Sequence, residues 1–265
     1  MNILDPNSYK YDSETEKRST KNYIICSTPR SGSTLLARGL WHTNIAGKPH
    51  EYFHQKWHMR KLQDRWNTLN LKEYIDTLKI KRKSENGVFG FKAHYYQLEK
   101  IIDDIDIENV FPKIKYIFIT RNDKIRQGIS LYRASLTKSW AYCEPETVIP
   151  EFDYKGIRKS IELIKKEEKN WNDFFMVKKI RPFKVIYETF NNNYRKTILA
   201  VVKYLDIKIP NDLRIEKPQL NKQSDELNDK WLEEFLAKKS KQSNWMTDKI
   251  FNLSNQGLHK LLKKS

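Results

Sequence analysis

The sequence lacks long hydrophobic runs, and it has only two cysteines, Cys26 and Cys143. No segment approaches the roughly 18 consecutive apolar residues of a membrane-spanning helix, and the polar start of the chain lacks the apolar centre of a signal peptide. The two cysteines lie far apart in the sequence, which argues against a disulfide-stabilised scaffold and fits a reducing compartment. We therefore expect a cytoplasmic protein without a membrane span.

Acidic residues are too few to balance the basic ones. The 265 residues include 50 lysines and arginines but 33 aspartates and glutamates, which gives a net charge of +17. Such an excess indicates a polyanionic partner, for example nucleic acid, an anionic membrane surface or a phosphorylated small molecule. A general preference for lysine and asparagine throughout the chain explains the same count, so the charge alone leaves the partner open.

Residues 22–40, NYIICSTPRSGSTLLARGL, predict an anion-binding site. The apolar residues that open this segment predict a buried strand, and the leucines near its end are spaced as in a helix. Residues 27–34 between them form a turn of small residues that contains Arg30, and Ser33 or Thr34 is placed to cap the helix. A strand, a tight loop and a helix N-terminus direct unpaired backbone N–H groups at one point, where a phosphate-like group binds. An ordinary turn would explain the serines, the proline and the glycine, but not the arginine.

The same loop lacks the pattern of an ATP-binding loop. G-x-x-x-x-G-K-[ST] needs a leading glycine and a lysine before the hydroxyl residue. Here the leading position is Thr28 or earlier, and Ser33 occupies the lysine position. These two absences argue against ATP with Mg²⁺ as the ligand.

Strands alternate with amphipathic helices along the rest of the chain. The further predicted strands are 88–93, 114–120 and 183–187, and the predicted helices are 71–80, 98–107, 123–136, 157–177, 194–205 and 229–237. The alternation predicts an α/β fold with a central, mostly parallel sheet flanked by helices. We divide the chain into a polar N-terminal arm, 1–21, and a single domain, 22–265.

A second anion site is predicted where the strand 114–120 ends. Arg121 follows this strand directly and enters a helix, and Ser130 lies nine residues further on. Ligands of α/β proteins collect at the carboxyl ends of the strands, so this arginine is well placed to hold a phosphate. A capped helix with a solvated arginine would explain the segment alone, but two anion sites at two strand ends fit a nucleotide with separated phosphates.

Six segments together resemble the Stf0-type sulfotransferase family. In chain order they are STPRSGSTLL, AGKPHEYF, VFGFK, ITRNDKIRQGISLYRA with Trp140, FKVIYE and NKQSDELNDKW. The resemblance implies a P-loop-like sulfotransferase fold and a donor called PAPS, 3′-phosphoadenosine 5′-phosphosulfate. Its sulfuryl group would pass to a hydroxyl of a sugar, glycolipid or other small acceptor, without a metal. The family precedent also suggests a homodimer.

The resemblance further implies roles for individual residues. Arg30, Ser31, Gly32, Ser33 and Thr34 would hold the 5′-phosphosulfate, Arg121 and Ser130 would hold the 3′-phosphate, Lys222 and Gln223 would lie near the donor, and Glu51 would be the general base. Sulfuryl transfer, like phosphoryl transfer, depends on positioning and on stabilising the leaving phosphate. An arginine and loop N–H groups suit the second task, and a carboxylate can take the hydroxyl proton.

The acceptor side is less defined. Its candidate residues are His50, Phe53, His54, Lys92, His94 and Trp140. A histidine, His50 or His54, is the rival to Glu51 as base. Trp140 suits stacking on a sugar ring and equally suits a core position. The spacing of His50, His54 and His58 could bind zinc on a helix, but no carboxylate or cysteine completes the set, and we expect no metal.

Two other functions stay open at this point. One is a P-loop-like kinase that uses ATP with Mg²⁺, and the other is a basic nucleic-acid-binding protein, suggested by the charge of +17.

Overall fold

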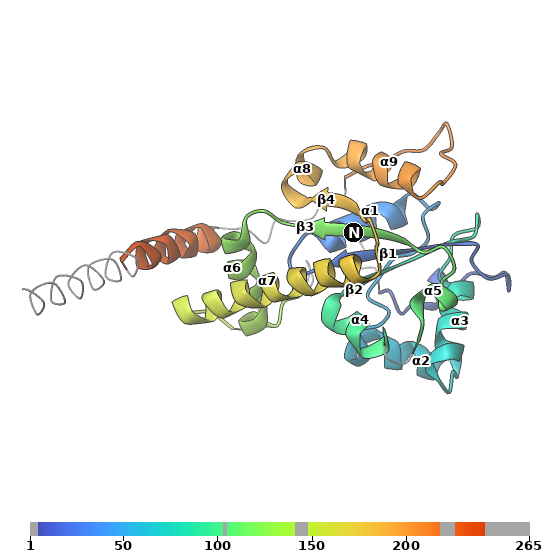
Figure 1. Cartoon of the computed structure of the whole chain (residues 1–265), viewed down its shortest axis with the longest axis horizontal. Helices are drawn as coiled ribbons and strands as arrows, with labels where there is room; N and C mark the ends of the chain where they lie inside the picture. The colour runs from blue at the N-terminus through green and yellow to red at the C-terminus, as the bar shows by residue number, and fades with distance from the viewer. Residues whose placement is uncertain (1–4, 103–104, 141–147, 218–225, 242–265) are drawn as a thin grey trace, which may run out of the picture.

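A parallel sheet forms the centre of the molecule (Figure 1). The computed structural model describes residues 5–102, 105–140, 148–217 and 226–241. Within these ranges the sheet has the strand order β2-β1-β3-β4, with all neighbours parallel. The strands are β1 (Lys21–Ser27), β2 (Val88–His94), β3 (Lys115–Thr120) and β4 (Phe183–Ile186). The predicted α/β fold is confirmed, and each predicted strand is present.

Helices connect the strands and cover the sheet. They are α1 (Ser33–His42), α2 (Arg60–Trp66), α3 (Leu71–Lys81), α4 (Tyr95–Ile102), α5 (Ile107–Val110), α6 (Lys124–Thr137), α7 (Tyr154–Val177), α8 (Tyr187–Asn192) and α9 (Tyr194–Tyr204), with a π-helical turn η2 (Gln55–Met59), a 3-10 turn η1 (Tyr9–Tyr11) and a helix over residues 226–241. No helix in the described ranges is long and apolar enough to cross a membrane.

One predicted helix, 98–107, was wrong in its bounds. The helix α4 begins at Tyr95, directly after β2, and a separate short helix begins after Asp106. The Asp106 carboxylate accepts a hydrogen bond from the Glu108 backbone N–H, and this capping bond starts the new helix. Sequence periodicity alone did not separate the two, because both contribute apolar residues to the same core.

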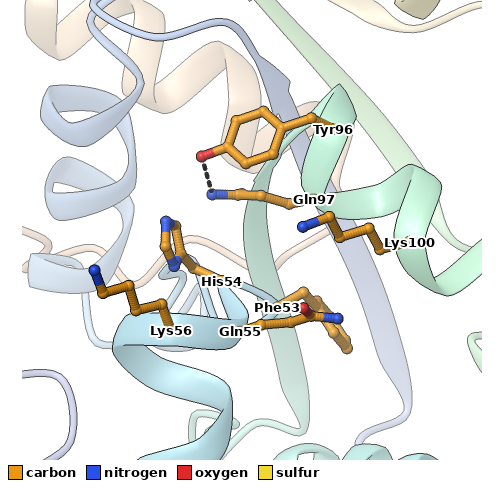
Figure 2. A pocket seen from close by; sticks show the side chains of 7 residues that line it. All are labelled: Phe53, His54, Gln55, Lys56, Tyr96, Gln97 and Lys100. Carbon is orange, nitrogen blue, oxygen red and sulfur yellow. Dashed lines mark hydrogen bonds between the residues drawn. The ribbon is translucent and has the colours of Figure 1, made fainter. Parts of the chain in front are cut away.

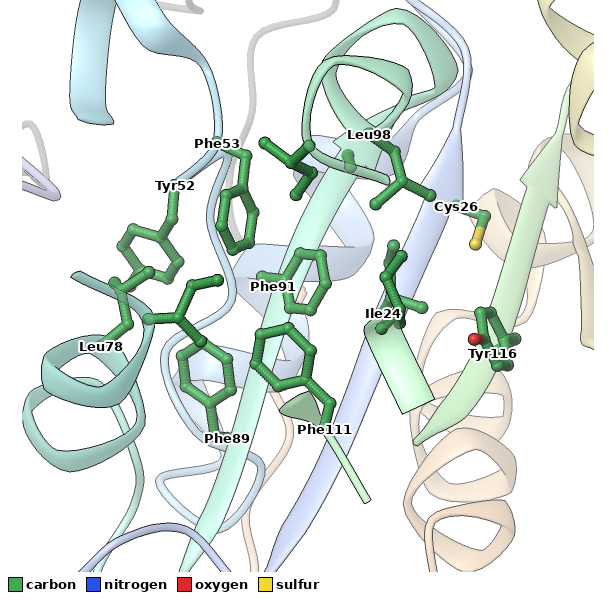
Figure 3. Close-up of a cluster of buried hydrophobic side chains, with 14 of the residues drawn as sticks. Ile24, Cys26, Tyr52, Phe53, Leu78, Phe89, Phe91, Leu98, Phe111 and Tyr116 are labelled. Carbon is green, nitrogen blue, oxygen red and sulfur yellow. The ribbon is translucent and has the colours of Figure 1, made fainter. Parts of the chain in front are cut away.

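Successive residues of β1 face opposite sides of the sheet. Ile24 and Cys26 join a core with α3, α4, α5 and α7, part of which Figure 3 shows around Phe91 and Phe111. Tyr23 joins the other core with α1, α8 and α9. Because both faces are covered, the strands are apolar throughout rather than alternating, which is typical of parallel sheets.

A smaller cluster joins the helix over residues 226–241 to α6 and α7. Trp231 and Phe235 from this helix pack with Ile129, Tyr154 and Ile157. The predicted helix 229–237 is therefore present, and it extends from α6 away from the sheet (Figure 1).

Asp12 and Ser13, which precede β1, lie against the C-terminal end of α3. Asp12 forms ion pairs with Arg82 at 2.7 Å and with Arg65 at 3.0 Å, and Arg82 is fully buried. The Ser13 backbone N–H donates to the Lys81 carbonyl at 2.8 Å. The division into an arm, 1–21, and one domain stays a prediction.

The carboxyl ends of the strands lie at one edge of the sheet. In the pairing register Ser27, the last residue of β1, lies opposite His94 of β2 and Ile119 of β3. Four segments therefore start from this edge: the loop before α1, the start of α4, the turn at Arg121, and the start of α8 at Tyr187. This is where ligands of open α/β sheets bind.

Candidate active site

The loop between β1 and α1 is a tight turn. The Ser31 N–H donates to the Thr28 carbonyl at 3.3 Å, and Arg30 and Gly32 have left-handed backbone angles, with φ of 62° and 87°. The first N–H groups of α1 have no acceptor within the helix, so they are available to an anion held by this loop. The predicted strand–loop–helix geometry is present.

The predicted cap of α1 was wrong. Gly32, rather than Ser33 or Thr34, is the N-cap residue, and within the described ranges no side chain caps the helix. The reason is steric: a Cβ atom at Gly32 would lie 2.3 Å from Cδ2 of Tyr187. Only glycine combines the left-handed backbone with so close an approach.

Buried polar side chains lie against the loop between β1 and α1. Gln127 of α6 is fully buried and donates from Nε2 to Thr28 Oγ1 at 2.9 Å and to the Pro29 carbonyl at 2.8 Å. The Ser31 hydroxyl is buried and has no hydrogen-bond partner among the described residues. Gln127 was not predicted as a site residue. The signal that could have indicated it is a polar residue at a position that faces the core side of α6.

Arg30 connects this loop to α6. Its Nε donates to Ser130 Oγ at 2.9 Å, and its Nη1 donates to the Trp140 carbonyl at 3.1 Å. Ser130, which the resemblance places with Arg121, therefore contacts Arg30 in this structure. The contacts hold the guanidinium against α6 and the residues that follow it.

Positive charge is concentrated around Arg30. Burial, and then the nearby charges of Arg121 and Arg133, lower the pKa of Arg30 to about 10, while Tyr187 acts in the opposite direction. Arg121 lies over the Tyr187 ring at 5.0 Å, and its Nε is buried with no hydrogen-bond acceptor in the described part of the chain. An anion bound among these arginines would gain charge-assisted hydrogen bonds and would relieve their repulsion.

The start of α8 holds the two arginine segments together. Tyr187 contacts both Gly32 and Arg121. The carboxylate of Glu188 accepts from the backbone N–H groups of Asn122 and Asp123, each at 3.1 Å. Burial tends to raise the pKa of Glu188. The N–H donors and the charge of Arg121 lower this pKa by more, so that it lies below the ordinary value of a glutamate. Neither residue was predicted to belong to the site. The predicted strand 183–187 included Tyr187, whereas β4 ends at Ile186 and Tyr187 begins α8.

Glu51 lies in a compact polar cluster. Its Oε1 accepts from Lys92 Nζ at 2.7 Å, its Oε2 accepts from Gln97 Nε2 at 2.7 Å, and His94 Nε2 lies 3.9 Å from Oε1. Burial tends to raise the pKa of Glu51, but Lys92, His94 and the two hydrogen bonds hold it well below the ordinary value. Glu51 is therefore a carboxylate at neutral pH.

Lys92 joins this cluster to the loop. Its Nζ also donates to Thr34 Oγ1 at 3.0 Å, and its side chain is 5% exposed. The candidate base and the first turn of α1 thus share one buried ammonium group, which fixes the position of Glu51 relative to the loop.

A pocket opens beside this cluster. It is lined by Phe53, His54, Gln55, Lys56, Tyr96, Gln97 and Lys100 (Figure 2). Gln97 belongs to both places, since it lines the pocket and contacts Glu51. Of the predicted acceptor residues, Phe53 and His54 line the pocket. The ring centroids of Trp140 and Trp57 are 6.0 Å apart. The Trp57 ring in turn stacks on the His54 ring, with 4.2 Å between the centroids.

The remaining predicted site residues have different environments. His50 and His58 pack ring against ring at 4.5 Å, and His94 lies beside Ser27, with Nδ1 3.0 Å from the Ser27 hydroxyl. Lys222 and Gln223 lie outside the described residues. Among the described residues, no group of three or more histidine, cysteine, aspartate or glutamate side chains is arranged to hold a metal ion.

The histidines lead to a prediction about acid stability. Burial lowers the pKa of His58 and of His94 to about 4, below the value of about 6.5 of an unfolded chain. Between these values the unfolded state binds protons that the folded state does not, so acidification destabilises the fold by up to about 1.4 kcal/mol per pH unit for each histidine. Urea unfolding should give a lower free energy of unfolding at pH 5 than at pH 7.5. The loss should be smaller in His58→Gln, and an equal loss in both proteins would contradict this explanation.

Comparisons with known proteins identify the family. The profile of the family described as Stf0 sulphotransferase matches residues 22–238. Trehalose 2-sulfotransferase of Mycolicibacterium smegmatis is 25% identical over 259 residues, covering 80% of this chain and 93% of that protein. Trehalose 2-sulfotransferase of Mycobacterium tuberculosis is 22% identical over 261 residues, covering 83% and 96%.

Two solved structures are also similar. The sulfotransferase domain of the Synechococcus olefin synthase has a TM-score of 0.47 and 18% identity, covering 83% of this chain and 90% of that one. Mouse sulfotransferase SULT7A1, complexed with PAP, has a TM-score of 0.43 and 16% identity, covering 77% and 63%.

Proposed function

The chain belongs to the Stf0 sulphotransferase family and is a sulfotransferase, and we propose that it transfers the sulfuryl group of PAPS to a hydroxyl of a carbohydrate or another small acceptor. The observation that supports this most directly is the arginine pair at the strand ends. Arg30 and Arg121 come from separate segments, the charge of Arg121 helps to lower the pKa of Arg30, and Arg30 lies two residues before the N-cap of α1. A donor with two separated phosphate positions suits two such segments.

The chain would hold the donor with residues from two strand ends. Arg30 and the loop 31–34 suit the 5′-phosphosulfate, because they combine a buried guanidinium, hydroxyls and unpaired N–H groups. Arg121, with its unsatisfied Nε, suits the 3′-phosphate. PAPS supplies a sulfuryl group that is attached to a good leaving group, the phosphate of adenosine 3′,5′-bisphosphate.

Glu51 suits the role of general base. As the acceptor oxygen bonds to sulfur, the bond between sulfur and the phosphate oxygen breaks, and its electron pair leaves with the phosphate. Glu51 would take the hydroxyl proton, and Arg30 would stabilise the charge that develops on the leaving oxygen. A low pKa keeps Glu51 in the proton-accepting form.

A sugar is the acceptor that we favour. Both curated relatives are named trehalose 2-sulfotransferase, and the pocket beside Glu51 combines aromatic rings with amide and imidazole groups. These groups suit the alternating apolar and hydroxyl faces of a sugar ring. The homodimer and the cytoplasmic location stay predictions.

Thermal unfolding with three ligands tests the donor. Adenosine 3′,5′-bisphosphate without Mg²⁺ should stabilise the protein by about 2.7 kcal/mol at a concentration 100-fold above its Kd, which raises the Tm by several degrees. ATP with Mg²⁺ should give a smaller shift, because the loop lacks the lysine of ATP-binding loops. No shift with the bisphosphate, together with tight, steeply salt-dependent binding of an oligonucleotide, would instead support a nucleic-acid-binding function.

Gly32 gives a test that separates the loop from general stability. In Gly32→Ala the new methyl group would meet Tyr187 and the backbone would be strained, so bisphosphate binding should fall at least tenfold, with a stability loss of about 1–3 kcal/mol. Gly87→Ala is a matched control, because Gly87 also has a left-handed backbone, with φ of 80°, and its Cβ would meet Thr20. It should lose similar stability but keep its bisphosphate affinity. Equal affinity in the two variants would contradict the role of the loop.

A further inference from the structure

The pocket beside Glu51 contains two lysines on different elements. Lys56 comes from η2 and Lys100 from α4, and Figure 2 shows them on opposite sides of His54. Among the residues that the structure describes, no carboxylate lines this pocket. A ligand in the pocket would thus meet positive charge from two directions.

Within the described part of the chain, neither Lys56 nor Lys100 has a carboxylate within ion-pair distance. Other lysines near the sheet do have one: Lys92 pairs with Glu51, Lys115 with Asp206, and Lys124 with Glu168. Both pocket lysines are near enough to His54 to affect its titration: after burial, which is the largest cause, their charges help to lower the His54 pKa. The imidazole therefore stays neutral at pH 7.

Two carboxylates that contact residues of the pocket are themselves held by hydrogen bonds. Glu51 is held by Lys92 and Gln97. Glu167 of α7 accepts from the Tyr96 backbone N–H at 3.3 Å at the start of α4, and burial raises its pKa. Neither of these two carboxylates forms an ion pair with Lys56 or Lys100.

We propose that the acceptor is anionic, a sugar or similar hydroxyl compound whose carboxylate, phosphate or sulfate group lies between Lys56 and Lys100 while its hydroxyl reaches Glu51. The inference rests on the proposed sulfotransferase function and specifies its substrate class. The pocket lies one side chain away from the base, because Gln97 lines it and donates from Nε2 to Glu51 Oε2 at 2.7 Å. Tyr96, which is 37% exposed, provides an apolar wall against which a sugar ring packs.

Acceptor pairs that differ by one anionic group test the proposal. The full chain would be assayed at saturating PAPS with trehalose and trehalose 6-phosphate, and with glucose and glucuronic acid, by mass spectrometry of the sulfated product. Binding of each acceptor in the presence of adenosine 3′,5′-bisphosphate would be measured by calorimetry. We expect the anionic member of at least one pair to have a kcat/KM, or an affinity, at least tenfold above that of its neutral partner. This preference should decrease as salt is raised from 50 to 500 mM, since salt screens exposed lysines.

Substitution of the lysines identifies the source of the preference. In the double variant Lys56→Gln/Lys100→Gln the ratio between anionic and neutral acceptors should fall to within about twofold of unity. The control is Lys72→Gln/Lys169→Gln, which removes two exposed lysines on α3 and α7, outside the pocket lining. It should keep the wild-type ratio. The Tm shift with the bisphosphate checks in each variant that the donor site is intact.

The outcomes separate the two proposals. A wild-type protein that neither binds the bisphosphate nor uses PAPS would overturn the proposed function. A protein that binds the bisphosphate but prefers the neutral acceptors, or that neither binds nor turns over any anionic one, would overturn the anionic acceptor alone. A preference that persists in the double variant would also overturn it, because another group would then hold the anion.

Discussion

Replacing Arg30 or Arg121 with alanine is expected to weaken binding of adenosine 3′,5′-bisphosphate by about 10²-fold or more in each case. A guanidinium forms paired, charge-assisted hydrogen bonds with a phosphate, and each such bond contributes roughly 1.5–3 kcal/mol. Both residues lie in the same positive cluster, where Arg121 is among the causes of the lowered Arg30 pKa. Loss of either one therefore removes charge from a single site.

The measurement is titration calorimetry with the bisphosphate, supported by the ligand-induced shift in Tm of each variant. Arg126→Ala is the matched control, because Arg126 lies on α6 between Arg121 and Ser130 but forms ion pairs with Asp123 and Asp229. It should bind the bisphosphate as the wild type does. If Arg121→Ala bound the bisphosphate as tightly as this control, the second phosphate site would be wrong.

Replacing Glu51 with glutamine is expected to lower kcat by a factor on the order of 10² or more, while bisphosphate affinity stays near the wild-type value. Glutamine keeps the shape of the side chain but cannot take a proton. Single-turnover rates at saturating PAPS measure this step. A fully active Glu51→Gln would transfer the role to a histidine, and the corresponding variants, His54→Gln and His50→Gln, would then show the loss.

The same substitution should also destabilise the protein, because it leaves the buried Lys92 ammonium without its carboxylate. Breaking a buried ion pair in this way costs about 3 kcal/mol or more. The double variant Glu51→Gln/Lys92→Met removes both charges and should recover much of the stability without recovering activity. Comparing the two variants separates a catalytic loss from a folding loss.

The pKa of Glu51 also predicts the pH profile. Glu51 is a base only when ionised, and its pKa lies well below 4.5, so acidification from pH 7 to pH 5 leaves it ionised. Loss of kcat/KM with a midpoint near pH 6.5 would indicate a histidine with an ordinary pKa instead. The described histidines all have lowered values, so substitution rather than pH decides among them.

The sequence was sufficient for the strand–loop–helix at Arg30 and for the order of the main elements. In a parallel sheet covered on both faces, apolar strands and amphipathic helices differ clearly in periodicity, and the site lies at the strand ends by topology. Arg30 and Arg121 could therefore be placed at one edge without coordinates.

The contacts between segments could not be predicted in the same way. Gln127, Tyr187 and Glu188 act on residues between 65 and 155 positions away in the chain, and nothing local distinguishes them from ordinary helix residues. The helix cap was missed for a related reason, since the residue that excludes a side chain at Gly32 is Tyr187. The link from Lys92 to Glu51 likewise depends on β2 lying beside β1, which strand patterns alone do not specify.

The site is shared between the two edge strands of the sheet, β2 and β4, and this sets how long it persists during thermal fluctuations. Lys92 lies on β2, and Tyr187 directly follows β4, which has four residues. Edge strands pair on one side only and open more readily than central ones. Opening of β4 would release the contact between Tyr187 and Arg121 and leave Glu51 in place, whereas opening of β2 would separate Lys92 from Glu51 and leave the arginines in place. Amide exchange at these two edges, with and without bisphosphate, would therefore follow the lifetimes of the donor half and the proton-accepting half independently.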